Sequence, residues 1–298
     1  MADEQRPHDA DCLHRFLFEE MPVRGELVHL DEAWLQVVAN EDYPPAVRAA
    51  LGEALAASVL LAATLKFDGM LTLQLTGDGP MHLLVVQCSS DREVRGLAKW
   101  RGQTDDKDLR ALAGDGRVII TIETGRNNER YQGIVPIAGG SLAASLEHYF
   151  ENSIQLPTRL WLATNGRIAA GMLLQRLPDT WGEQAEAAWE HVQILAQTLS
   201  TSELRDLHDS DILRRLFNQD DLLLFDAQPV KFRCSCTRDR VESTLRMLGR
   251  EEISTLVEEE GQVEVRCEFC NRAYHFDTVD VEGLFSGLAP SDAPPTLH

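Results

Sequence analysis

Polar and apolar positions between residues 46 and 175 follow two different periods. A helical pattern runs from Ala46 to about Lys66 and ends at Phe67-Asp68-Gly69. Beyond it, apolar and polar residues alternate one by one, which is typical of half-buried strands. The predicted strands are Met70–Thr76, Met81–Cys88, Glu93–Ala98, Arg117–Glu123, Tyr131–Ile137, Thr158–Thr164 and Arg167–Gln175.

Turn signals separate several of these strands. Gly77-Asp78-Gly79-Pro80, Gly125-Arg126-Asn127-Asn128 and Asn165-Gly166 each lie between neighbouring strands and predict antiparallel hairpins. Ser141 is placed to cap a helix in the sequence SLAASLEHYFENS. Many strands joined by short turns, with helices inserted between them, indicate an α+β domain built on antiparallel sheet, which we assign to residues 1–178.

Residues 179–231 differ in character and are predicted to form a helical linker. Glu183–Leu199 has a helical pattern, Ser200-Thr201-Ser202-Glu203 has the spacing of a capping box, and Asp211–Phe217 is a short amphipathic segment. An apolar run, Leu222, Leu223, Leu224 and Phe225, then follows acidic residues. The run suggests a segment that docks on another surface, although an ordinary packed segment has the same pattern.

The charge of the chain restricts its partners. The 298 residues include 28 Lys and Arg against 48 Asp and Glu, a formal net charge of -20. This charge argues against nucleic acid and against anionic membranes as partners. The uncharged run Ala54–Leu65 is too short to span a bilayer and is expected to form a buried core helix. The acidic N-terminus lacks the apolar run of a secretory signal, so we expect a reducing cytoplasm.

Cysteine spacing carries the candidate chemistry. The six cysteines are Cys12, Cys88, Cys234, Cys236, Cys267 and Cys270. The last four form a C-x-C pair and, thirty residues later, a C-x-x-C pair, which together supply the donors of a tetrahedral four-thiolate zinc site. We predict one Zn²⁺ per chain on these four. Two structural disulfides are the alternative, and a reducing compartment disfavours them. Cys12 and Cys88 are expected to be buried and without a role.

The segment that carries the four cysteines, residues 232–288, is predicted to be a zinc-binding redox-switch domain. A unit of this size is marginally stable, and metal binding can supply its folding free energy. Zinc holds the sulfurs as thiolates, the form that oxidants attack, and each pair is close enough to become a disulfide. A C-x-C disulfide closes a small, strained ring that is easily reduced again. The Pro-rich tail, residues 289–298, is expected to be disordered.

At this point the chain resembles the redox-regulated 33-kDa heat-shock chaperones, or chaperonins, of the bacterial cytoplasm. The resemblance covers nearly the whole chain, and the C-x-C with a distant C-x-x-C is the specific mark of that family. The segments that carry it are Gly79–Cys88, Tyr131–Pro136, Ser141–Pro157, Ala170–Pro178, Cys234–Gly249 and Cys267–Phe276.

The resemblance implies an ATP-independent holdase rather than an enzyme. In such proteins oxidation pairs the cysteines that match Cys234 with Cys236 and Cys267 with Cys270, and it expels the metal. The zinc domain and the linker then become disordered and expose apolar surface that binds unfolding client proteins, and dimerisation accompanies activation. In this chain the candidate client-binding residues are Leu222, Leu223, Leu224 and Phe225, expected to be covered in the reduced state.

Two other functions are compatible with parts of the sequence. One is a constitutive zinc-ribbon adaptor or nucleic-acid module, which the acidic charge and the C-x-C spacing weaken. The other is a thiol–disulfide enzyme using Cys267-Glu268-Phe269-Cys270, but Asn271–Phe276 lacks the helical pattern that such enzymes place there. Zinc retention after oxidation favours the first of these, and turnover of a dithiol substrate favours the second.

Overall fold

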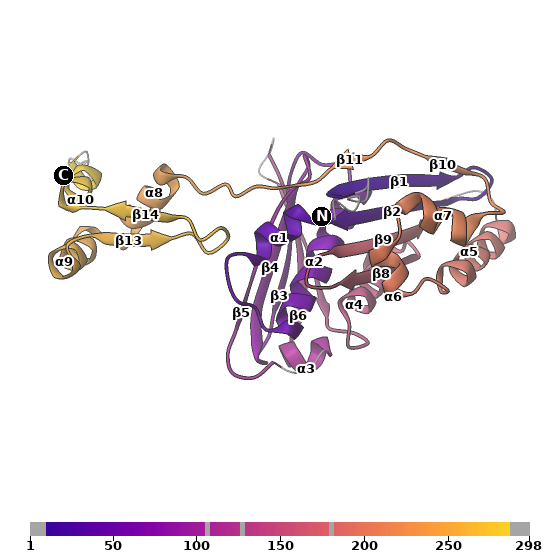
Figure 1. Cartoon of the computed structure of the whole chain (residues 1–298), viewed down its shortest axis with the longest axis horizontal. Coiled ribbons are helices and arrows are strands. Elements are labelled where there is room, and N and C mark those ends of the chain that lie inside the picture. Colours follow the sequence, from indigo (N-terminus) through magenta and orange to yellow (C-terminus); the bar gives the residue numbers. More distant parts are fainter. Residues whose placement is uncertain (1–9, 105–107, 126–128, 179–181, 287–298) are drawn as a thin grey trace, which may run out of the picture. The chain divides into compact units, whose positions relative to one another are not determined.

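The computed structural model describes residues 10–104, 108–125, 129–178 and 182–286. The chain divides into two compact units, Met1–Arg233 and Cys234–His298. The first unit is rich in β-sheet and the second is small (Figure 1). An α+β chain with a sheet-rich N-terminal part, as the sequence predicts, is confirmed.

Two sheets of six strands form the first unit. The first sheet has the order β10-β1-β2-β9-β8, with β11 also paired to β1, and the second has the order β12-β5-β4-β3-β6-β7. Every pair is antiparallel except β12 with β5. The strands of the first sheet are β1 (Cys12–Phe18), β2 (Val23–Leu30), β8 (Thr158–Thr164), β9 (Ala169–Arg176), β10 (Leu222–Leu224) and β11 (Gln228–Pro229). Those of the second are β3 (Gly69–Thr76), β4 (Met81–Ser89), β5 (Glu93–Trp100), β6 (Arg117–Thr124), β7 (Arg130–Pro136) and β12 (Lys231–Phe232).

One long helix, α2 (Pro45–Thr64), lies between the two sheets and contacts strands of both. It begins with proline at its first position, where the missing N–H leaves no hydrogen bond unmade. It is the one helix among the described residues that is long and apolar enough to cross a membrane. However, 72% of its most apolar 18-residue stretch is buried inside the unit. Gly171 of β9 lets the helix approach closely, because a Cβ there would lie 2.8 Å from Leu60 Cδ1. The expected buried core helix is confirmed.

Local polar contacts confirm several of the predicted boundaries. Ser141 Oγ accepts a hydrogen bond from Ala144 N (3.2 Å) and caps α4 (Leu142–Tyr149), which continues into the π-helical turn η1 (Phe150–Ile154). Asn165 Oδ1 accepts from the N–H groups of Arg167 and Ile168 and closes the β8–β9 turn. The remaining helices here are α1 (Glu32–Val38) and α3 (Leu109–Ala113). Residues 126–128 of the predicted β6–β7 turn lie outside the described residues.

Three linker helices cover the face of the first sheet that is turned away from α2 (Figure 1). They are α5 (Glu183–Ala196), α6 (Thr201–Asp206) and α7 (Asp209–Phe217). The predicted capping box is present, because Ser200 Oγ accepts from Glu203 N and the Glu203 carboxylate accepts from Ser200 N. The helices and the sheet share one apolar cluster, formed by Phe16, Phe18, Val23, Leu27, Ala163, Ala170, Met172, Leu174, Trp189, Val192, Ala196, Leu199, Leu204, Ile212, Leu213, Leu216 and Phe217. We call this the linker cluster.

The second unit has five described elements. They are α8 (Arg238–Leu248), α9 (Arg250–Glu260), β13 (Val263–Arg266), β14 (Ala273–Phe276) and α10 (Thr278–Ser286), with β13 and β14 antiparallel. Its apolar core is small and consists of Leu245, Ile253, Val257, Val263, Phe276, Val281, Leu284 and Phe285. The predicted disordered tail lies outside the described residues. The predicted division of the chain into core, linker, zinc domain and tail at residues 178, 231 and 288 stays a prediction.

Candidate metal centre

The structure brings the four C-terminal cysteines together. Cys234 and Cys236 precede α8, and Cys267 and Cys270 lie in the turn between β13 and β14. All four Sγ atoms lie within 4.8 Å of one another, with Cys234 to Cys267 at 3.6 Å and Cys236 to Cys270 at 3.3 Å. The turn is tight, because Asn271 N donates to the Cys267 carbonyl (2.7 Å) and Cys267 N donates to the Arg272 carbonyl (3.0 Å).

These distances suit a metal ion. A tetrahedral site with zinc–sulfur bonds of about 2.3 Å places its sulfurs roughly 3.8 Å apart. A disulfide requires about 2.05 Å, and the four cysteines are free thiols in this structure. A set of four thiols around one centre is also the donor chemistry that zinc prefers. The cluster therefore fits a single tetrahedral ion.

The electrostatics of the cluster call for a cation. Burial acts to raise the pKa of the Cys236 thiol, but hydrogen bonds from Tyr274 and the three other thiols outweigh it and lower the pKa to about 7. Burial raises the pKa of Cys267, and it also raises the pKa of Cys270, where hydrogen bonding to the neighbouring sulfurs adds to the effect. The neighbouring groups thus favour the thiolate of Cys236, and a bound divalent ion would stabilise all four sulfurs as thiolates.

Tyr274 of β14 is a contact that the sequence analysis did not identify. Its hydroxyl donates a hydrogen bond to Cys236 Sγ at 3.2 Å. The sequence feature that could have identified this contact is an aromatic residue in the strand directly after the C-x-x-C turn. The histidine of the same strand, His275, lies 3.5 Å from the Glu264 carboxylate and is not among the clustered donors.

The two remaining cysteines are buried, as predicted. Cys12 is 6% exposed and Cys88 is fully enclosed. Burial raises the pKa of the Cys88 thiol to about 12, which makes it a poor nucleophile at neutral pH.

The apolar run after the linker helices forms an edge strand. Leu222, Leu223 and Leu224 make up β10 and pair with Phe18, Leu17 and Phe16 of β1. Leu223, Leu224 and Phe225 are 46%, 44% and 42% exposed, whereas Leu222 packs against the linker cluster. The expectation that this run is covered is therefore wrong for three of its four residues. The reason is that β10 is the edge strand of the first sheet and pairs with a neighbour on one side only. Their binding of clients stays a prediction.

The covered apolar surface lies instead beneath the linker helices. Phe217 of α7 packs against Phe18 (ring centroids 5.0 Å apart) and Phe16 (6.3 Å) of β1. Trp189 of α5 is 3% exposed in the same cluster. Sequence patterns predicted a helix over Glu183–Leu199 and an amphipathic segment over Asp211–Phe217, but not which surface of the chain they cover.

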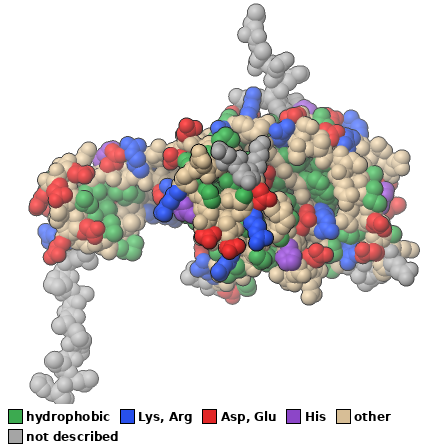
Figure 2. Space-filling model, turned by 90° about the horizontal axis from the view of Figure 1, so that it is seen from below, with side chains coloured by type: hydrophobic (Ala, Val, Ile, Leu, Met, Phe, Trp, Pro, Cys, Tyr) green, Lys and Arg blue, Asp and Glu red, His purple; other side chains and the backbone are tan. Residues whose placement is uncertain are grey.

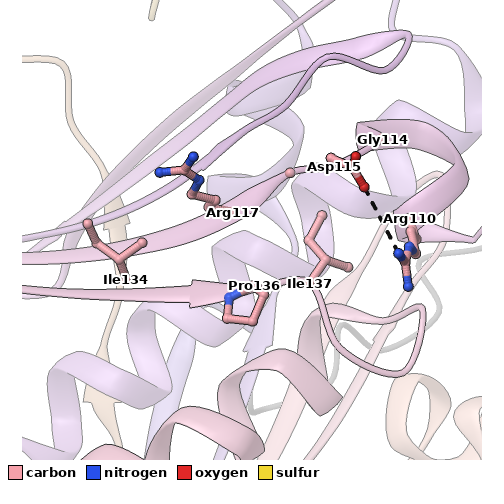
Figure 3. Close-up of a pocket in the computed structure, with 8 residues that line it drawn as sticks. Arg110, Gly114, Asp115, Arg117, Ile134, Pro136 and Ile137 are labelled. Atoms are coloured by element: carbon pink, nitrogen blue, oxygen red, sulfur yellow. Dashed lines mark ion pairs between the residues drawn. The ribbon is translucent and has the colours of Figure 1, made fainter.

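A pocket of about 480 Å³ lies beside the end of β7 (Figure 3). Arg110 and Asp115 approach each other there at 4.0 Å, and both side chains are exposed. Ile134, Pro136 and Ile137 form its apolar part. The residues that line this pocket include no nucleophile paired with a base, so they provide no argument for a reaction.

Comparisons with known proteins agree with this architecture. The model of the family described as "Hsp33 protein" matches residues 11–277. A 33 kDa chaperonin of Methylobacillus flagellatus is 47% identical over 93% of this chain and 95% of its own length, and one of Nitrosococcus oceani is 47% identical over 98% and 100%. The crystal structure of a 33 kDa chaperonin from Thermotoga maritima superposes with a TM-score of 0.81 at 24% identity, covering 93% of this chain and 98% of that one. The last comparison shows the shared fold.

Proposed function

The chain belongs to the Hsp33 family, and from this premise we propose that it is a redox-regulated, ATP-independent holdase that binds unfolding client proteins. The observation that carries the proposal is the cluster of four thiols within 4.8 Å of one another. The proposal includes a cytoplasmic location, and the reducing conditions there keep the thiols available.

In the reduced state the four cysteines hold one Zn²⁺. Zinc, when bound, keeps the sulfurs as thiolates and joins the two cysteine pairs. Peroxide or hypochlorous acid then oxidises Cys234 with Cys236 and Cys267 with Cys270. Formation of each S–S bond transfers two electrons from a pair of thiolates to the oxidant. Peroxide takes up two protons from solvent and becomes two waters, and hypochlorous acid takes up one proton and becomes chloride and water. Four donors are lost in two such steps, so the metal leaves.

Loss of the metal removes most of what keeps the second unit folded. Its apolar core is small, and structural zinc supplies roughly 10–16 kcal/mol in small metal-binding domains. Between α7 and Cys234 the chain forms only the short strands β10, β11 and β12, which pair with β1 and β5. We propose that unfolding of the second unit frees these short strands and then the linker helices.

Release of α5, α6 and α7 uncovers the apolar half of the linker cluster that lies on β1, β2 and β9. Apolar contact is non-directional and depends on buried area rather than on a particular sequence. Such a surface suits clients of many kinds. The exposed side chains of Leu223, Leu224 and Phe225 extend it along β10, which pairs with β1.

The high negative charge makes this exposure tolerable. Acidic side chains are scattered over the face shown in Figure 2, with basic side chains between them. A net charge of -20 favours solubility while apolar surface is open. We propose that activated chains pair as homodimers, which shares the uncovered surface between two copies.

The experiment measures zinc and client aggregation in the same samples. Reduced protein should hold one zinc per chain and should not suppress the aggregation of a heat-unfolding client, followed by light scattering. Oxidant with mild heat should release the zinc and turn suppression on. Zinc retained through oxidation would favour a constitutive zinc-ribbon adaptor instead.

A variant tests the ligand set. Cys267→Ser with Cys270→Ser should impair zinc binding and uncouple activity from oxidant, whereas Cys88→Ala, a buried thiol outside the cluster, should leave both unchanged. Full zinc content in the double variant would contradict the assignment.

A further inference from the structure

A buried charged cluster joins the last linker helix to the sheet beneath it. Asp209, the first residue of α7, is 1% exposed. Its two carboxylate oxygens lie 2.6 Å from His14 Nδ1 of β1 and 2.7 Å from His29 Nδ1 of β2. The three side chains therefore connect one helix with two neighbouring strands at the edge of the linker cluster.

The surroundings of His29 favour a protonated ring. Its Nε2 lies 2.6 Å from the Leu204 carbonyl oxygen of α6, and its Nδ1 faces the Asp209 carboxylate. Both neighbours are acceptors, and a ring that carries hydrogen on both nitrogens, an imidazolium, matches both of them. Burial acts to raise the pKa of Asp209, but hydrogen bonds from His14 and His29 outweigh it and lower that pKa, so the carboxylate is charged.

The cluster is better suited to protons than to a metal. Cys12, His14 and Asp209 offer donor atoms within 4.8 Å of one another, which raises the question of an ion. Ligands at about 2.0–2.2 Å from an ion are held roughly 3 Å or more apart. The 2.6 Å separation of His14 Nδ1 from Asp209 is that of a charge-assisted hydrogen bond, and His29 Nδ1 lies at ion-pair distance, 2.7 Å, from the other carboxylate oxygen.

We propose that Asp209, His14 and His29 form an ionic latch that holds α7 on the first sheet and sets how readily the linker is released. Breaking a buried ion pair leaves an uncompensated charge, so loss of either partner strongly favours the open linker. Asp209 also lies in the first turn of α7, where the helix dipole favours a negative charge. Asp209 is thus a positioning residue. The consequence for client binding rests on the proposed function, whereas the latch itself does not.

The latch makes linker docking sensitive to pH. The groups that face Asp209 are His14, with Cys12 beside it, from β1 and His29 from β2, and α6 contributes the Leu204 carbonyl to His29. The docked linker holds a proton on His29 that a released histidine, with an ordinary pKa of about 6.5, gives up above neutral pH. Docking is therefore weakened as pH rises, because the docked state binds more protons.

Hydrogen exchange of the full, zinc-loaded chain tests the latch. Asp209→Asn should speed exchange in α7 at least tenfold at pH 7 while zinc stays at one per chain. The matched control is Asp211→Asn in the same helix, an exposed residue that pairs with Arg214 at 3.7 Å, and it should exchange like the wild type. Equal protection in the two variants would overturn the latch.

The pH profile separates a charged latch from a merely structural contact. After correction for the intrinsic exchange rate, wild-type α7 should open at least fivefold more readily at pH 9 than at pH 7. Asp209→Asn and His29→Gln should each change less than twofold over this range. A flat wild-type profile would overturn the latch even if a variant fails to fold.

Client assays then distinguish the two proposals. Asp209→Asn should suppress client aggregation without oxidant and with its zinc in place. If oxidised wild-type protein does not protect a client while the exchange and pH results hold, the latch stands and the proposed function fails.

Discussion

The two units of this chain are stabilised by different means. In the first, α2 lies between two six-stranded sheets, and its leucines belong to an extensive apolar core. In the second, a short hairpin and three helices share a small apolar cluster beside four thiols. Burial alone can hold the first unit, whereas the second depends on what binds its sulfurs. On the proposed function, an oxidant would therefore unfold the second unit and leave the first unit folded.

The linker helices occupy an intermediate position. They pack on the first unit, yet their apolar cluster is separate from the core around α2, on the opposite face of the same sheet. Their release would not open the main core. This separation allows a folded platform to expose apolar surface.

Removal of the metal should produce the largest difference in stability between the two units. Chelation of zinc under reducing conditions removes roughly 10 kcal/mol or more from the second unit, so α8–α10 should lose protection against hydrogen exchange. Strands β3, β4 and β6 of the first unit should stay protected. Equal loss in both units would show that the chain folds as one cooperative unit.

Truncation of a side chain in the linker cluster should have the next largest effect. Trp189→Ala removes a large buried side chain and should destabilise linker docking by about 3–5 kcal/mol. Ile194→Ala, on the same helix and 57% exposed, should change it by less than about 0.5 kcal/mol. Hydrogen exchange of α5, measured together with the zinc content, checks both variants. Unchanged exchange of α5 in Trp189→Ala would contradict the docking of α5 through the linker cluster.

Truncation in the main core should lower stability without touching the metal. Leu60→Ala should reduce the free energy of unfolding of the first unit by about 2–5 kcal/mol, because Leu60 is fully buried and lies close to β9. Leu65→Ala, at 41% exposure, is the matched control with a small effect. Denaturant unfolding measures the difference, and zinc affinity should be equal in the two variants.

The smallest effect should come from the hydroxyl beside the sulfurs. Tyr274→Phe removes the donor to Cys236 and should weaken zinc binding about tenfold, as outer-shell changes do. A competition titration with a chromophoric chelator measures it. Unchanged affinity would show that the four sulfurs alone set the strength of the site.

Sequence patterns predicted the middle of the first unit well. Strands β3 to β9 alternate in burial or follow clear turn signals, and the capping residues Ser141 and Ser200 act as expected. Strands β1 and β2 were not predicted. Nearly every residue of β2 is buried, including Glu26 and His29, so its polar residues do not mark a solvent face. Strands β10–β12 are short and owe their existence to tertiary pairing.

The residues of the candidate site fall into the same two groups: those that local sequence patterns predict and those that only tertiary contacts bring together. Cysteine spacing identified four residues that the structure gathers, because two short motifs suffice for that inference. The contact of Tyr274 with Cys236, the surface under α5 and α7 and the Asp209 cluster depend on residues far apart in sequence. Asp209 and His14 are separated by 195 positions, and no local pattern announces their meeting.

The most direct test follows zinc release and hydrogen exchange together as oxidant is added to the reduced, zinc-loaded chain. The account predicts that zinc loss, exchange of α8–α10 and exchange of α5–α7 rise together, while β3, β4 and β6 remain protected. Linker helices that stay protected after the zinc has left would contradict it.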